Sequence, residues 1–162
     1  MDTRRVGEDE RHEYSFGAAR GIPALIAHGP PSDDRPAALL FPGAEQHFAN
    51  VFVDDVAAFY VLALERAPAG SYFLIANPDA PRISEIAQAA SRGRGWDGRV
   101  TPEPETDTRA RLGPLTDAIL LDEEVDCTHA MQLGWTPTGP ALLQELEHGS
   151  YSDTYEDPET SS

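Results

Sequence analysis

Apolar residues between positions 54 and 66 recur at helical spacing. Starting at Val56, the positions i, i+3, i+4, i+7 and i+8 are Val56, Phe59, Tyr60, Ala63 and Leu64, which predicts one face of a helix. Val61 and Leu62 fill much of the other side, so we expect this helix to be the most buried element. Asp54 and Asp55 open the segment and are predicted to cap it, because carboxylates accept hydrogen bonds from the free N–H groups of a helix start.

Three further helices are predicted from apolar spacing and from start and stop residues. The first begins at Ile83, has Ile83, Ile86, Ala87 and Ala90 on one face, and ends in the stretch 91–95. The second covers 124–133 and follows a capping Asp122. The third has Thr138 as its expected N-cap and Pro140 in its first turn, and ends at Gly149.

Short β-branched or aromatic runs predict two or three strands, at residues 50–53, 71–76 and 99–101. Prolines, aspartates and a glycine mark 29–36 as a loop. The polar stretch 103–114 is expected to be irregular, with a helical turn around 108–112 as the alternative. The predicted fold class is α/β, in the form of a small α+β unit with helices packed on a few short strands.

The folded body is predicted to span residues 17–151. Residues 1–16 are rich in acids and arginines and are expected to form a frayed N-terminus, and the acidic, Ser/Thr-rich segment 152–162 is expected to be a disordered tail.

Composition narrows the class of protein. Hydrophobic residues make up 40% of the 162 positions, which is enough for a packed core. The sequence has neither a long apolar run nor the apolar region of a secretory signal, so no membrane attachment and a cytoplasmic location are expected. Cys127 is the single cysteine and is predicted to be a packed, inert thiol, and the five histidines lack zinc spacing, so no metal site is expected.

Charge excludes several functions. The formal net charge of −16 disfavours binding to nucleic acid or to an anionic membrane. All 12 basic residues are arginines. The absence of lysine rules out Schiff-base chemistry, a Walker-A loop and a Tyr-x-x-x-Lys dyad within this chain.

Several motifs in order resemble one known family. The core is residues 45–57, EQHFANVFVDDVA, followed by LALE at 62–65, APAG at 67–70, ISEIA at 83–87, LGWTP at 133–137 and LLQELEHGSY at 142–151. The segment GIPAL at 21–25 is similar to the part that precedes them. The chain resembles the C-terminal part of the extended and atypical short-chain dehydrogenases, the NAD(P)-dependent epimerase/dehydratase-like family.

The resemblance implies a substrate-binding domain without its Rossmann half. The family's Gly-x-x-Gly-x-x-Gly turn binds the dinucleotide, and its Tyr-x-x-x-Lys pair is the general acid/base. Neither motif occurs in this chain, so it is expected to have no catalytic or cofactor-binding residue of its own. NAD or NADP is implied only for the complete enzyme, and the partner is then a Rossmann-bearing chain or a second copy.

The implied substrate-binding residues are His47, Phe48 and Asn50. A solvated loop is the alternative for His47, and hydrogen bonding at the strand edge is the alternative for Asn50. The family often has an arginine where this chain has His47 and a histidine where it has Phe52. Because arginine binds phosphate bidentately and histidine does not, a small or weakly charged substrate is expected rather than a sugar nucleotide.

Three functions stay open at this point. The chain is a truncated or split dehydrogenase that needs a Rossmann-bearing partner, or an independent small-molecule-binding or dimerisation module, or an enzyme of another kind that uses Asp54 or His47. In the first case the surface that packs on the missing half is exposed, which predicts self-association or marginal stability.

Overall fold

The computed structural model describes residues 15–17, 21–27, 29, 31–32, 35–42 and 45–152. The described chain is a mixed α/β structure, as the sequence predicts. Its helices are α1 Ile22–Ala27, α2 Val53–Arg66, α3 Ile83–Gly93, α4 Glu105–Leu112, α5 Leu115–Ile119, α6 Thr128–Leu133 and α7 Leu142–His148. Its strands are β1 Ser15–Phe16, β2 Pro31–Ser32, β3 Arg35–Pro42, β4 Val51–Phe52 and β5 Val100–Glu103.

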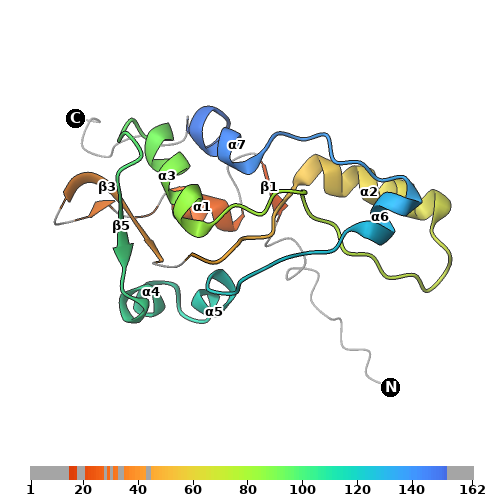
Figure 1. Cartoon of the computed structure of the whole chain (residues 1–162), viewed down its shortest axis with the longest axis horizontal. Helices are drawn as coiled ribbons and strands as arrows, with labels where there is room; N and C mark the ends of the chain where they lie inside the picture. The colour runs from red at the N-terminus through yellow and green to blue at the C-terminus, as the bar shows by residue number, and fades with distance from the viewer. Residues whose placement is uncertain are drawn as a thin grey trace, which may run out of the picture.

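Two small sheets connect distant parts of the chain. β1 pairs in parallel with β4, with Ser15 opposite Val51. β3 lies between β2, which is antiparallel to it, and β5, which is parallel with Leu39 opposite Val100. The two sheets share no strand, and the helices lie between and beside them along the long axis of the molecule (Figure 1).

The larger apolar core surrounds α3. Ile83, Ile86, Ala87 and Ala90 are all buried, which confirms the predicted face. The two isoleucines are fully covered and each contributes about 1.5–3 kcal/mol by leaving water. α1 and α7 pack against this helix, and any side chain at Gly93 would collide with the backbone carbonyl of Leu146 in α7. Glycine therefore sets the close approach of α3 and α7.

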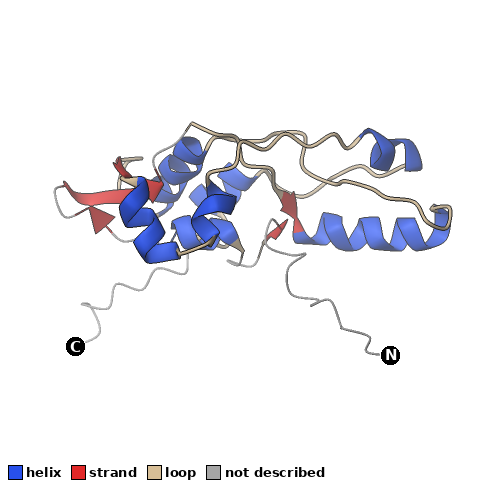
Figure 2. Ribbon diagram, turned by 90° about the horizontal axis from the view of Figure 1, so that it is seen from below, coloured by secondary structure: helices blue, strands red, loops and turns tan. Residues whose placement is uncertain are grey.

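A second apolar core lies at the other end of the molecule, between α2, α6 and residues 73–76 (Figure 1). The Phe59 ring makes edge contacts with Phe73 and Trp135, at centroid distances of 5.4 and 6.0 Å. We call the part formed by α2, residues 67–76 and α6 the α2 lobe. Figure 2 shows α2 and α6 at the same end of the molecule, joined to the rest of the structure by extended segments.

The prediction that α2 is the most buried element is wrong. Only Asp55 and Phe59 of α2 are buried, whereas six residues of α3 are. Tyr60, Val61 and Leu64 are exposed, Leu64 to 88%. Apolar residues all around a helix predict burial only where neighbours exist on every side, and the described chain covers one side of α2.

Several boundaries also differ from the predictions. Residues 71–76 are extended but belong to no strand, because none of the segments that the structure describes pairs with them. Residues 105–112 form a helix, which contains the alternative turn at 108–112 and extends it, and β2 and β3 enter the expected loop 29–36. The helix expected over 124–133 is confined to α6, and the last helix begins at Leu142 with Ala141, rather than Thr138, at its N-cap position.

The predicted ends lie mostly outside the described residues. Within the expected frayed terminus 1–16, the described residues Ser15 and Phe16 form β1 and pair with β4. Ser152, the first residue of the expected tail, donates its hydroxyl to the Gly149 carbonyl oxygen at 2.7 Å. In the described ranges, no helix has the length and apolar character needed to cross a membrane.

Candidate functional site

Asp55 joins α2 to the loop before α7. The helix begins at Val53, and its N-cap residue Phe52 makes no side-chain capping bond, so the predicted capping role of Asp54 and Asp55 is wrong. Both lie in the first turn, where negative charge complements the helix dipole. The Asp55 carboxylate is buried and accepts the backbone N–H groups of Thr138 and Gly139 at 2.9 and 3.0 Å. This explains why Thr138 does not cap α7.

His47 is fixed by one carboxylate. Its backbone N–H donates to Asp122 Oδ1 at 2.7 Å, and its ring Nδ1 lies 2.9 Å from the same oxygen. The hydrogen bond from the His47 backbone, and to a smaller extent the one from its side chain, lowers the pKa of Asp122. Asp122 therefore holds the chain at His47 instead of capping a helix, and the imidazole, about one-third exposed, lines a cavity.

Phe48 and Asn50 are in different environments from His47. Phe48 is buried in the larger core, which places its ring away from a ligand. Asn50 is also buried, and its amide donates to the carbonyl oxygens of Phe48 and Asp79 at 3.2 and 3.3 Å. Its Oδ1 accepts from Asn77 at 3.1 Å. These bonds give Asn50 a structural part in holding residues 77–79, although it also lines a cavity.

Two adjoining cavities lie beside residues 47–51. One of about 350 Å³ is lined by His47, Asn77, Pro78, Ala80 and Glu124, and one of about 250 Å³ by Asn50, Val51, Leu74, Ile75 and Glu123. Ala49, Ala76 and Val125 line both. We call the two together the 47–51 groove. His47 and Asn50 thus border one groove from opposite halves, whereas Phe48 does not reach it.

Glu123 is a groove residue that the sequence analysis missed. Burial raises the pKa of its carboxyl, and the hydrogen bond from the Ala49 backbone only partly offsets this effect. Its Oε2 is buried and has no hydrogen-bond partner. A carboxyl of raised pKa at a cavity is a candidate for binding or proton transfer. Its position within the acidic run 122–124, directly after the apolar segment 118–121, was the available signal.

The groove favours ligands that donate hydrogen bonds and disfavours phosphates. Its walls contain the carboxyl groups of Glu123 and Glu124, and its lining includes neither arginine nor lysine. Carboxylates accept hydrogen bonds from hydroxyl or amino groups and repel phosphates. The apolar side chains of Val51, Leu74 and Ile75 add a surface for a hydrocarbon part.

Cys127 is buried near this groove. The Ala76 backbone N–H donates to its sulfur at 3.0 Å, and burial raises the pKa of the thiol. A thiol with a raised pKa is a poor nucleophile, so the environment matches the predicted inert residue. Among the described residues, no group of three or more His, Cys, Asp or Glu side chains is arranged to hold a metal ion.

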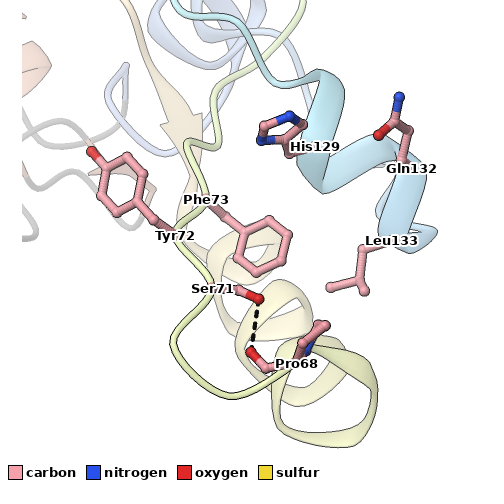
Figure 3. A pocket seen from close by; sticks show the side chains of 7 residues that line it. All are labelled: Pro68, Ser71, Tyr72, Phe73, His129, Gln132 and Leu133. Atoms are coloured by element: carbon pink, nitrogen blue, oxygen red, sulfur yellow. Dashed lines mark hydrogen bonds between the residues drawn. The ribbon is translucent and has the colours of Figure 1, made fainter.

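A further cavity of about 470 Å³ lies in the α2 lobe, between the end of α2 and α6 (Figure 3). Phe73 and Leu133 are half-buried in it, and Ser71, Tyr72 and His129 are exposed at its border. The Ser71 hydroxyl donates to the Pro68 carbonyl oxygen at 2.7 Å, which closes the turn after α2. The implied substrate-binding residues His47, Phe48 and Asn50 do not line this cavity.

Comparison with protein-family models, with curated proteins and with solved structures finds no match to this chain.

Proposed function

We propose that this chain is the substrate-binding C-terminal portion of an NAD(P)-dependent epimerase/dehydratase-like oxidoreductase, with its small-molecule site in the 47–51 groove. One observation supports the proposal above others. Residues 45–57 carry the core of the resemblance, and their segment 47–51 borders both adjoining cavities.

In this proposal the chain binds and orients substrate, and a Rossmann-bearing chain supplies the nicotinamide, which exchanges a hydride with a carbonyl or alcohol carbon. Asp122 occupies His47 Nδ1, which leaves Nε2 to hydrogen-bond a substrate hydroxyl. The acidic walls favour a small neutral substrate over a sugar nucleotide, in agreement with the absence of an arginine at position 47.

Titration with NADH, followed by its fluorescence, tests the need for a partner. We expect no binding by the chain alone. Binding is expected after co-expression with a chain, encoded at the neighbouring locus, that contains Gly-x-x-Gly-x-x-Gly and Tyr-x-x-x-Lys. NADH binding by the isolated chain, or a neighbouring locus that encodes neither motif, would contradict the proposal.

The substrate class is tested by NMR titration, in which the chemical shifts of the backbone amides are followed as neutral monosaccharides, or the phosphates of the same sugars, are added. We expect the amide signals of residues 47–51 to shift with the neutral sugars and not with the phosphates. His47→Ala should weaken that binding, and His129→Ala, at the cavity in the α2 lobe, is the matched control. Preference for the phosphates would contradict the assignment.

A second function, a dimerisation module derived from the same family, is favoured by the exposed apolar side chains of α2. This second function requires a surface of the chain through which two copies can bind each other.

A further inference from the structure

Residues 71–76 have the features of a strand but no partner strand. The backbone N–H and C=O groups of residues 72–75 make no hydrogen bond within the described part of the chain. On either side the segment is tied down, by the Ser71 N–H to the Pro68 carbonyl oxygen at 3.1 Å and by the Asn77 N–H to the Asn50 carbonyl oxygen at 2.7 Å. The unpaired backbone groups therefore belong to a segment that is held in place at both ends.

The side chains of this segment alternate as they do in a strand. Tyr72 and Phe73 point to opposite sides of the chain (Figure 3). Phe73 and Ile75 pack on the core of the α2 lobe, whereas Tyr72 and Leu74 are exposed to 77% and 45%. An exposed strand edge with unpaired backbone groups is a template for pairing with another strand.

The sequence on and near the edge has little charge, although Glu123 lines a cavity with Leu74 and Ile75. In a chain with a net charge of −16, neither residues 67–78 nor residues 127–144 contain an Asp, Glu, Lys or Arg. Most of the exposed large apolar side chains of the described residues also belong to the α2 lobe or to the first turn of its helix: Val53, Tyr60, Val61, Leu64, Tyr72, Leu74 and Met131. Two copies can approach along residues 71–76 without the strong like-charge repulsion that the acidic surface imposes elsewhere.

We propose that two copies of this chain dimerise by antiparallel pairing of residues 71–75, which joins their α2 lobes. The paired segment shares Leu74 and Ile75 with the lining of the 47–51 groove, but the inference rests on the unpaired backbone of the segment and not on a ligand in the groove.

The segment is complementary to itself under two-fold symmetry. Residues directly opposite in an antiparallel pair lie on the same face of the sheet, so exposed residues must meet exposed residues. With Phe73 opposite Phe73 of the second copy, Tyr72 lies opposite Leu74 and Ser71 opposite Ile75. The pair of Tyr72 and Leu74 then forms twice, and aromatic–aliphatic cross-strand pairs stabilise antiparallel sheets. A shift by one residue would place exposed side chains opposite core ones.

Sedimentation equilibrium over a range of concentrations tests the proposal. Wild type is expected to form a dimer, and Tyr72→Glu to raise the dimer dissociation constant about tenfold or more, because two charges enter the paired strands. Tyr60→Glu is the matched control, since it places the same charge on the exposed face of α2 in the same lobe. Tyr72→Phe should leave the dissociation constant unchanged.

Amide hydrogen exchange supplies a measurement that needs no variant. Because alternate N–H groups of a strand point to its antiparallel partner, the amides of either residues 72 and 74 or residues 73 and 75 should exchange more slowly at high than at low protein concentration, whereas α2 amides should not change. A wild type that stays monomeric, a dimer that Tyr60→Glu dissociates and Tyr72→Glu does not, or exchange at 72–75 that is independent of concentration would each overturn the proposal.

Discussion

Among single residues, the neighbouring carboxylates Asp54 and Asp55 have different roles although the sequence gives no reason to separate them. Asp54 is exposed, whereas Asp55 is 3% exposed and holds the loop at residues 138–139. The Trp135 indole N–H also donates to the Asp55 carbonyl oxygen at 3.1 Å. Position 55 therefore connects the start of α2 to two points of the chain about 80 residues later.

We expect Asp55→Ala to lower the free energy of unfolding by on the order of 3 kcal/mol, because two backbone donors lose a charged acceptor in a buried place. Asp54→Ala is the matched control. It removes only a favourable charge near the helix start, worth about 0.3–1 kcal/mol. Urea unfolding followed by circular dichroism measures both, and equal losses would contradict the distinction.

Glu123 predicts a pH dependence of stability. Burial raises its folded pKa above the unfolded value of about 4.5, so the ionised form is less favourable in the folded protein. The contribution of this group to stability is fully present below the unfolded pKa and is lost as pH rises through the folded pKa. Glu123→Gln, which stays neutral, should therefore gain stability relative to wild type as pH rises above about 4.5.

Urea unfolding at several pH values tests this expectation. Glu124→Gln removes the same charge at an exposed neighbouring position, and so separates the effect of burial from that of net charge. A difference between wild type and Glu123→Gln that does not vary with pH would contradict it.

At the scale of elements, helix positions were predictable where one apolar face has one neighbour. The stripe on α3 identified its buried residues, and the strand run at 50–53 gave β4. The same reasoning failed for α2 and for residues 71–76, because apolar composition and strand propensity do not specify which segment lies opposite. Of the implied site residues, His47 and Asn50 reach the groove. Glu123 could not be predicted as a groove residue, because the sequence does not show that residues 122–124 lie against residues 47–49.

The two faces of α2 should respond differently to substitution. Phe59→Ala removes a buried ring that contacts Phe73 and Trp135 and should cost about 3–5 kcal/mol. Leu64→Ala, on the face exposed to solvent, should change the unfolding free energy by less than about 0.5 kcal/mol. The comparison is made by urea unfolding at a concentration where wild type is monomeric, and a large loss for Leu64→Ala would show that this face is covered.

For the whole molecule, the excess of acidic residues sets the response to salt. A net charge of −16 repels itself in the compact state. The described ion pairs are few and mostly exposed, so screening should remove more repulsion than attraction. We expect the melting temperature to rise as sodium chloride increases from about 0.01 to about 0.15 M.

A calorimetric salt series measures this, with sucrose at matched osmolality as the uncharged control. A melting temperature that falls over the same range of salt would mean that the arginine pairs outweigh the general repulsion.

The separation of the apolar residues into two cores has a spectroscopic consequence, because each core contains one tryptophan. Trp135 is buried in the core of the α2 lobe, and Trp96 is half-buried against the core around α3, with the Arg94 guanidinium 4.1 Å from its ring centroid. Trp96→Phe and Trp135→Phe therefore yield proteins whose fluorescence reports on one end of the molecule at a time. Because Trp135 is the more buried of the two, its emission maximum should lie at the shorter wavelength. Unfolding kinetics recorded on the two variants then show separately when each end of the molecule loses its structure.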